Sequence, residues 1–402
     1  MLRVRHTSPV RSGGAEKRMD DQELRHWIAL RFVEDLGCAG CRRLLDHFGS
    51  PRDILAAPET ELRRVSRISG KAAEAVRRFS DWKRVDEELE DAARSGVSLL
   101  PMTHPDYPGE LRHLPDPPPL LYVRGTLREE PAVAVVGSRR ATVYGKFMTD
   151  RLVRELARHG IAVVSGLARG IDTAAHWGAL RAKGRTVAVL GSGIDVVYPR
   201  ENGELMERIP ESGAVVTEFP FRTPPLALNF PARNRIISGL SMGVAVVEAG
   251  EKSGSLITAR LALEQGKEVF AVPGSIDSPV SRGTHRLLRQ GAKLVESVHD
   301  ILEEIFPRVL FSEVEKQSAR MGPDPAALSR EERRSGGGEI GETGEREAAL
   351  LRILGDRPVQ VDEMIRASGL DSKEVLSLLL SLELQGLVRQ LPGKQFVLKE
   401  RT

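Results

Sequence analysis

A phenylalanine and two arginines stand close together in the segment FPARNR, and their side chains suit the binding of a flexible polyanion. Arg233 and Arg235 offer planar guanidinium groups for phosphate oxygens, with Asn234 between them. Phe230 offers a ring face on which a nucleic-acid base can stack. The turn at residues 253–255 opens a predicted helix, whose first backbone N–H groups attract anions. Together these residues predict a groove for a polyanion.

Short loops rich in glycine and serine follow four of the predicted strands. In an open parallel sheet, ligands bind at the carboxyl ends of the strands, where loops meet helix N-termini. Glycine lets the backbone approach a phosphate closely because it carries no Cβ atom. Two of the loops also carry an arginine, which adds charge-assisted hydrogen bonds. The predicted anion-binding loops contribute Gly137, Ser138, Arg139, Ser165, Gly166, Arg169, Gly170, Gly191, Ser192, Gly193, Ser253, Gly254 and Ser255.

Carboxylates near the same strand ends leave general acid–base catalysis open as an alternative; they are Asp172, Asp195, Glu218 and Glu248. Asp172, however, opens a predicted helix, a position that suits an N-cap. The sequence shows neither a Ser-His-Asp order with a nucleophile elbow nor metal-ligand spacing. It also lacks a complete dinucleotide fingerprint and a Gly-Lys-Ser/Thr phosphate loop, which disfavours NAD and ATP. We therefore expect a binding site without metal or cofactor.

Six apolar runs alternate with amphipathic stretches between residues 131 and 307, and they predict the elements that position these loops. Runs rich in Val and Ala without polar alternation are typical of strands buried on both faces. The pattern predicts an α/β fold, an extended Rossmann-like parallel sheet with helices on both faces. The predicted strands span residues 132–136, 161–164, 186–190, 214–217, 244–247 and 269–272.

The region before the α/β domain divides into a tail, a helical domain and a connector. Residues 1–20 predict a disordered tail, and residues 21–100 resemble a SAM-like or helix-hairpin-helix domain whose glycine turns can hold a phosphate. Residues 101–130 are rich in proline, which predicts a stiff, extended connector. Cys38 and Cys41 have the spacing of a redox pair or half a zinc site, but no second Cys or His pair lies nearby. We therefore expect structural cysteines.

The region after the α/β domain predicts a flexible linker at residues 308–346 and a winged-helix domain at residues 347–402. The predicted recognition helix, residues 371–385, carries one lysine among several acidic side chains. A major-groove reader needs basic and amide groups along that face. We therefore expect this domain to contact protein or to regulate, rather than to read duplex DNA.

The size and charge of the chain set broad limits on its function. Its 402 residues allow two or three domains, and its formal net charge of +3 means that any basic surface must be local. No apolar run approaches the ~20 residues of a membrane helix, and the start of the sequence lacks the apolar block of a secretory signal. We expect a cytoplasmic protein.

Six motifs, in this order, closely resemble those of the DNA-processing protein A family, DprA, also called Smf. They are GSR at Gly137, SGLARGID at Ser165, GSGIDVVYP at Gly191, FPARNRIISGLS at Phe230, VVEAGEKSGSLITA at Val246 and VFAVPG at Val269. The resemblance implies a protein without enzymatic activity that binds single-stranded DNA without sequence preference and protects incoming strands. It also implies loading of the RecA recombinase during natural transformation. The implied DNA contacts are the loop residues named above together with Phe230, Arg233, Asn234 and Arg235.

The same resemblance implies a homodimer formed through the late part of the α/β domain. His285, Leu288 and Leu294 offer an apolar seam there, although a helix that faces the core explains the leucines equally well. The single-stranded DNA-binding protein is a further candidate partner, and no membrane partner is expected.

Two other functions stay open at this point. A nucleotide phosphoribohydrolase shares the Rossmann-like body but uses a Pro-Gly-Gly-x-Gly-Thr-x-x-Glu stretch. The nearest segments, residues 254–255 and 273–275, do not complete that stretch. A structural adaptor that binds only proteins conflicts with the arginines of the predicted rim.

Overall fold

The computed structural model of the chain describes residues 20–306 and, beyond them, residues 350, 353–354, 359–368, 370, 375, 378–379, 382, 388–391 and 395–398. Contacts divide the chain into two compact units, Met1–Glu313 and Val314–Thr402. The predicted linker, most of the predicted tail and most of the predicted recognition helix lie outside the described residues.

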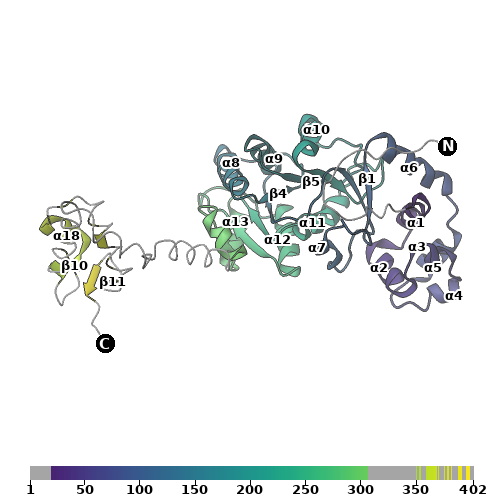
Figure 1. Cartoon of the computed structure of the whole chain (residues 1–402), viewed down its shortest axis with the longest axis horizontal. Coiled ribbons are helices and arrows are strands. Elements are labelled where there is room, and N and C mark those ends of the chain that lie inside the picture. Colours follow the sequence, from purple (N-terminus) through teal and green to yellow (C-terminus); the bar gives the residue numbers. More distant parts are fainter. Residues whose placement is uncertain are drawn as a thin grey trace, which may run out of the picture. The chain divides into compact units, whose positions relative to one another are not determined.

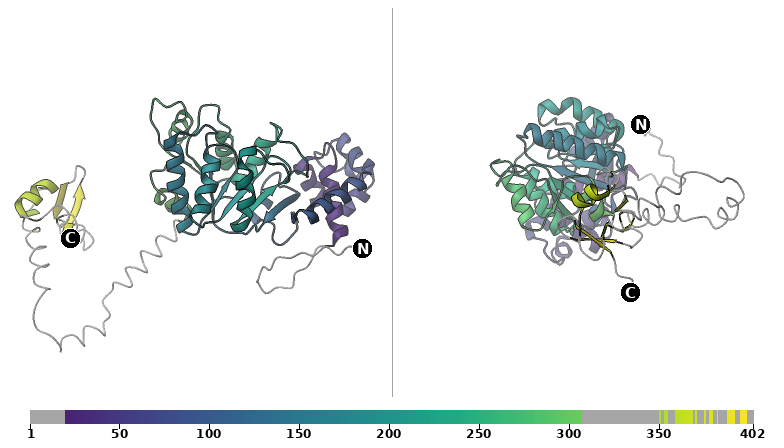
Figure 2. Two further views of the ribbon diagram at one scale, coloured as in Figure 1. Left: turned by 90° about the horizontal axis from the view of Figure 1, so that it is seen from above. Right: turned by 90° about the vertical axis from the view of Figure 1, so that its left-hand side faces the viewer.

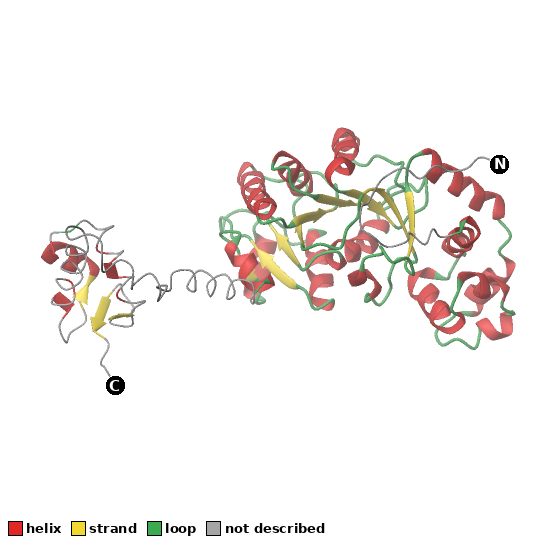
Figure 3. Ribbon diagram, viewed as in Figure 1, coloured by secondary structure: helices red, strands yellow, loops and turns green. Residues whose placement is uncertain are grey.

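A nine-stranded sheet forms the centre of the first unit (Figures 1 and 3). Its strands run in the order β1-β2-β6-β5-β4-β3-β7-β8-β9. Pairs from β6 to β9 are parallel, whereas β2 is antiparallel to both β1 and β6. The strands are β1 (Ser98–Pro101), β2 (Leu120–Gly125), β3 (Ala132–Val136), β4 (Ala162–Ser165), β5 (Thr186–Val189), β6 (Ala214–Thr217), β7 (Gly243–Val246), β8 (Glu268–Ala271) and β9 (Lys293–Leu294).

The six predicted strands correspond to β3 through β8, and each predicted boundary agrees with the structure within one residue. Their residues are buried almost throughout, as a sheet covered on both faces requires. In β3, the side chains of Val133 and Val135 pack into one apolar cluster, and those of Ala134 and Val136 pack into the other. This alternation follows from the two-residue period of a strand.

Helices cover both faces of the sheet (Figure 1). One face carries α8 (Val143–Arg158), α9 (Ile171–Arg181) and α10 (Gly203–Ser212). The other face carries α7 (Gly109–Arg112), α11 (Asn229–Gly239) and α12 (Ser255–Glu264). The remaining helices of this part are η1 (Arg200–Asn202), α13 (Arg282–Arg289) and α14 (His299–Ile305). The arrangement confirms the Rossmann-like fold.

Six helices form a separate group at the β1 edge of the sheet (Figures 1 and 2). They are α1 (Asp21–Phe32), α2 (Gly37–Phe48), α3 (Pro51–Ala56), α4 (Glu59–Leu62), α5 (Gly70–Arg78) and α6 (Trp82–Arg94). Local signals explain several of their starts. Asp20, Ser50, Ser69 and Asp81 each accept a hydrogen bond from a backbone N–H of the helix that follows, as N-cap residues do.

The proline-rich segment at residues 101–130 contributes to the sheet, so the prediction of a plain extended connector is wrong. Its prolines lie in the loops, while the apolar run LLYVRG that follows them forms β2 and pairs with β6. The hydroxyl of Tyr107 donates to the carbonyl of Pro118 at 2.8 Å and holds the intervening loop closed. The sequence interpretation failed because it treated the prolines as typical of the whole segment, although they mark only its turns.

In the second unit, the described residues include α18 (Val361–Ser368) and a three-stranded sheet in the order β10-β12-β11. Its strands are β10 (Val359–Gln360), β11 (Val388–Leu391) and β12 (Gln395–Leu398). β11 and β12 are antiparallel and form a hairpin, an element of the winged helix expected for residues 347–402. In neither unit do the described residues include a helix long and apolar enough to cross a membrane.

Candidate nucleic-acid interface

The order of the strands places a crevice beside β3. The chain passes from β3 through β4 and β5 to β6 on one side, and then returns to β7 on the other side of β3. Loops after β3 and β7 therefore leave the sheet in opposite directions, and ligands of open α/β sheets bind at such a point. Arg139 follows β3 here, and the turn at residues 253–255 follows β7.

An aromatic and cationic cluster forms at this edge of the sheet, and we call Arg139, Tyr198, Phe230 and Arg233 the rim cluster. The guanidinium carbon of Arg139 lies 5.2 Å from the centre of the Phe230 ring. The Tyr198 ring lies 5.6 Å from the same ring at an angle of 42°. Arg139 is exposed, Tyr198 is 39% exposed, and Phe230 is half-buried. The cluster thus presents two partly exposed rings and an exposed cation to solvent.

Arg233 is the buried member of the rim cluster. Its side chain is buried, and Nη1 donates to the carbonyl of Gly166 at 2.6 Å and to the carbonyl of Val189. Burial lowers the pKa of Arg233 to about 10, so the guanidinium remains charged at neutral pH. Its hydrogen-bond acceptors are carbonyls, and none of the ion pairs among the described residues includes it. The buried carboxylate of Asp172 interacts electrostatically with this guanidinium and raises its pKa against the effect of burial, so an anion above the cluster would add to a partial compensation that already exists.

The glycines of the predicted loops allow this close packing. A Cβ atom at Gly191 would lie 2.9 Å from the Phe230 ring, and one at Gly166 would lie 2.2 Å from Nη1 of Arg233. Gly170 has a φ of +78°, and a Cβ atom there would lie 2.1 Å from the carbonyl oxygen of Ser138. A side chain at any of these positions would displace the rim cluster or its supporting loop.

Internal hydrogen bonds occupy part of the backbone cradle predicted for phosphate. Asp172 accepts from the N–H groups of Gly166 at 3.1 Å and Ala168 at 3.3 Å. The N–H of Gly193 donates to the carbonyl of Thr223 at 2.9 Å, and Ser165 Oγ donates to the carbonyl of Val135 at 2.7 Å. These groups shape the loops and are not free to bind an anion.

Asp172 organises the loop before α9, and this differs from its predicted role as N-cap. The N-cap residue is Gly170, and Asp172 lies in the first helical turn with its carboxylate folded back onto the preceding loop. Burial raises the pKa of Asp172.

The remaining predicted loop residues have mostly structural contacts. Ser138 Oγ accepts from the N–H of Arg140 at 3.1 Å, and Ser192 Oγ donates to the carbonyl of Val196 at 3.2 Å. Arg169 forms an exposed ion pair with Glu201. That pair is open to exchange with a phosphate because surface ion pairs are weak.

The turn after β7 is joined to α11. Ser253 and Ser255 share a hydrogen bond of 2.8 Å between their hydroxyls. Asn234 Nδ2 donates to the carbonyl of Gly254 at 3.4 Å. Asn234 therefore links this turn to the helix that carries Phe230, and Gly254 itself is exposed.

Arg235 lies away from the rim cluster, which corrects the prediction that it continues a basic track. Its Nε donates to Asp116 at 2.9 Å, and its Nη2 donates to Glu218 at 2.8 Å. The residue is 6% exposed. Arg235 therefore joins the helical group to the sheet through Nε and Nη2, and it contributes no contact to the rim cluster.

The carboxylates considered for catalysis are all engaged. Glu248 accepts from the N–H and hydroxyl of Thr142 and so stabilises the N-terminus of α8. Asp195 accepts from the N–H of Arg222 at 2.9 Å. With Asp172 on its loop and Glu218 on Arg235, the arrangement favours binding over proton transfer.

Two histidines also have packing roles. His176 is fully buried, Nδ1 lies 2.7 Å from the hydroxyl of Thr186, and burial lowers the pKa of His176 to about 3. His285 lies on α13, with Nε2 3.1 Å from the carbonyl of Gly274. Leu288 on the same helix is half-buried, and Leu294 on β9 is 43% exposed. The predicted dimer seam is thus separate from the rim cluster.

Tyr198 is the rim residue that the sequence interpretation missed. It was within the motif GSGIDVVYP, but no role was given to it. Aromatic residues make up only 4% of the chain, and this one follows a strand whose loop was already a predicted ligand loop. The rarity of tyrosine and its place after the predicted strand are the signals that pointed to it.

Comparisons with known proteins found relatives that cover most of this chain. The family described as DNA recombination-mediator protein A matches residues 98–306, and the DprA winged helix domain matches residues 340–394. Protein Smf of Escherichia coli (strain K12) is 42% identical over 300 residues, which cover 73% of this chain and 76% of that protein. Protein Smf of Synechocystis is 34% identical over 397 residues, covering 94% and 99%. The X-ray structure of DNA processing protein A (DprA) from Streptococcus pneumoniae is similar with a TM-score of 0.63 and 36% identity, covering 70% of this chain and 97% of that one.

Proposed function

Since this chain belongs to the DNA recombination-mediator protein A family, also called DprA or Smf, we propose that it binds single-stranded DNA without sequence preference. The protein then protects the bound strand and loads RecA onto it in the cytoplasm during recombination or transformation, with the single-stranded DNA-binding protein as a further partner. The observation that supports this proposal most is the rim cluster. The exposed guanidinium of Arg139 lies over the Phe230 ring, and the buried guanidinium of Arg233 lies close to the same ring. This arrangement suits a polymer in which phosphates and bases alternate.

The rim cluster would bind a nucleotide through two coupled contacts. A base that stacks on Phe230 replaces the guanidinium of Arg139 over that ring. Arg139 is then free to pair with the neighbouring phosphate, while Arg233 stays buried below. Stacking accepts every base because each has a π face, and phosphate contacts carry no sequence information. The geometry thus supports binding without sequence preference.

Replacing Arg139 with Ala tests this proposal. We expect weaker binding of an oligothymidine, and a plot of log affinity against log salt whose slope is smaller by about 0.7 for one lost phosphate contact. The fold should be unaffected because the Arg139 side chain is exposed and makes no hydrogen bond among the described residues. The measurement is fluorescence anisotropy at several salt concentrations.

Arg151→Ala is the matched control for that experiment. Arg151 is an exposed arginine on α8 that does not belong to the rim cluster. Its replacement by alanine changes the net charge of the protein by the same amount as Arg139→Ala. Identical slopes for the two variants would contradict the assignment of Arg139 as a phosphate ligand.

We also propose a homodimer through His285, Leu288 and Leu294. Leu294 is 43% exposed, and Ile276, in the loop before α13, is 84% exposed, so this end of the sheet offers apolar surface to a second copy. In light scattering, Leu294→Arg should halve the mass of a wild-type dimer because it places a charge in the seam. Leu228→Arg, at an exposed leucine before α11, should leave the mass unchanged. A dimeric mass for Leu294→Arg would refute this seam.

A further inference from the structure

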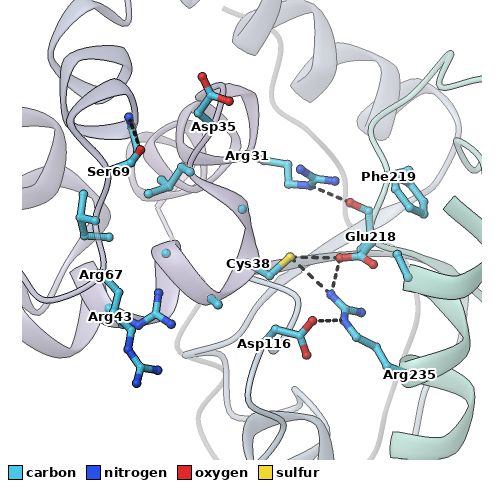
Figure 4. A pocket seen from close by; sticks show the side chains of 17 residues that line it. Arg31, Asp35, Cys38, Arg43, Arg67, Ser69, Asp116, Glu218, Phe219 and Arg235 are labelled. Carbon is cyan, nitrogen blue, oxygen red and sulfur yellow. Dashed lines mark hydrogen bonds and ion pairs between the residues drawn. The ribbon is translucent and has the colours of Figure 1, made fainter. Parts of the chain in front are cut away.

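A pocket of about 490 Å³ lies between the helical group and the sheet (Figure 4). Its walls come from the α1–α2 region, from the turn before α5, and from residues at the end of β6 and on α11. Neither the rim cluster nor the proposed dimer seam includes residues of this pocket. The pocket is therefore a second concave surface of the same unit.

Arginines outnumber carboxylates by one in this pocket. Its lining contains Arg31, Arg43, Arg67 and Arg235 against three carboxylates, Asp35, Asp116 and Glu218. Asp116 and Glu218 are already paired with Arg235, whereas Arg43 and Arg67 have no hydrogen-bond or ion-pair partner for their side chains among the described residues. Figure 4 shows both side chains at the same part of the pocket wall in that view. Two unpaired guanidinium groups that line one cavity suit a phosphate.

Backbone N–H groups add to the positive potential of the pocket. The first residues of α2 line it, and the N-cap of that helix, Leu36, provides no side-chain acceptor for them. The N-terminal end of α5 lines the same pocket through Ser69 and Ala72, where Ser69 Oγ already accepts from the N–H of Ala72 at 3.0 Å, so this helix contributes mainly its dipole. Two helix N-termini that open onto one cavity attract an anion more strongly than either does alone.

A buried arginine supplies an independent indication of a ligand. The Arg235 side chain is 8% exposed, and its Nη1 has no hydrogen-bond partner among the described residues. Figure 4 shows the guanidinium pointing from α11 toward the centre of the pocket. A buried donor without a partner is costly, so an acceptor such as a phosphate oxygen would be favourable there.

Helix α11 connects this pocket to the rim cluster. Phe230 belongs to the rim cluster, whereas Ala232, two residues further along the helix, is exposed and lines the pocket. The two positions differ by about 3 Å along the helix axis but by about 160° around it, so they face different sides of the first turn of α11. A strand stacked on Phe230 would therefore cross over this exposed first turn to enter the pocket.

We propose that this pocket binds the phosphate backbone of the same single DNA strand that the rim cluster holds, as a second contact for strands long enough to reach it. This inference rests on the proposed function and adds the helical group to the DNA-binding surface. Arg43 and Arg67 bind the phosphates directly, and the first turn of α2 adds backbone donors.

Strand length separates this contact from the rim cluster. We expect the double variant Arg43→Ala/Arg67→Ala to bind an oligothymidine of about 6 nucleotides as the wild type does. It should bind one of about 30 nucleotides about tenfold more weakly, with a salt slope smaller by about 1.4 for two lost phosphate contacts. The full chain and fluorescence anisotropy are used throughout. The variant should fold normally because neither side chain forms a hydrogen bond or ion pair among the residues that the structure describes.

Arg64→Ala/Arg77→Ala is the matched control, because these arginines lie in the same helical group, are exposed, and do not line the pocket. Equal affinities of wild type and the Arg43/Arg67 variant for the long strand would overturn the inference. Losses as large in the control would do the same, since they would show a general charge effect.

A free nucleotide is the other ligand to test. Thermal stabilisation by ATP that disappears in the Arg43/Arg67 variant, with long-strand binding unchanged, would mean that the pocket holds a free nucleotide instead. If the wild type binds neither strand, both the proposed function and this inference are wrong. If Arg139→Ala weakens binding of both strand lengths, the proposed function stands even when the pocket variant has no effect.

Discussion

Replacing Arg235 with Met should lower the free energy of unfolding by about 3–5 kcal/mol, the usual effect of removing one partner from a buried ion pair. Glu218 is 2% exposed, and its carboxylate faces Nη2 of Arg235 at 2.8 Å. Without Arg235, this carboxylate would stay buried with only the thiol of Cys38, which lies 3.3 Å away, as a donor. Urea-induced unfolding followed by circular dichroism measures the change.

Arg222→Met provides the comparison. Arg222 also joins the sheet to the helical group, through an ion pair with Asp91, but its side chain is 62% exposed. Exposed pairs contribute about 0–1 kcal/mol, so this variant should be nearly as stable as the wild type. Similar losses for both variants would show that burial does not distinguish the two ion pairs.

A second variant separates the unpaired charge from lost packing. Glu218→Leu in the Arg235→Met background removes the carboxylate that would otherwise stay unpaired, and it should restore part of the lost stability. No recovery would mean that the Arg235 effect comes from packing between the helical group and the sheet.

The cysteines next to this ion pair behave as buried thiols. Burial raises the pKa of Cys41 to about 12 and raises the pKa of Cys38 as well. Such thiols are poor nucleophiles and poor metal ligands because the thiolate is the reactive form. The expectation of structural cysteines therefore agrees with their surroundings.

The parallel part of the sheet could be predicted because its strands are continuous runs of Val and Ala, which only a sheet buried on both faces tolerates. The antiparallel edge could not be predicted in the same way. β1 ends at Pro101, and β2 begins directly after a run of three prolines. These prolines predicted turns and so hid the two short apolar strands beside them. β9 has only two residues, too few for any period to appear.

The rim cluster was predicted only in part, because the sequence did not show which side chains of FPARNR share a face. In a helix, Phe230 and Arg233 differ by about 60° around the axis, whereas Phe230 and Arg235 differ by about 140°. The helical period alone separates the two arginines, as the structure does. It could not show that Glu218, which lies 17 residues earlier in the sequence, would pair with Arg235.

The glycine loops illustrate a different limit. Their spacing correctly indicated the carboxyl edge of the sheet, but a sequence does not show whether a loop N–H is free. Asp172 takes two of those N–H groups. These two N–H groups are thus not free for a phosphate, and the side chains of Arg139 and Phe230 are the more direct test of the proposed site.

Replacing Phe230 with Ala should weaken binding of single-stranded DNA by about 1–3 kcal/mol, the usual contribution of one stacked base. This loss corresponds to an affinity about 5- to 150-fold lower. The ring also packs on Gly191 and contacts the ring of Tyr198, so a loss could come either from stacking or from a disturbed loop. Phe230→Leu distinguishes the two because it keeps apolar volume on Gly191 but has no π face. If a base stacks on Phe230, both variants should bind oligothymidine equally weakly, and Phe230→Trp should retain the affinity. Wild-type affinity in Phe230→Leu would show that the residue serves only to pack the loop, and the proposed stacking would be wrong.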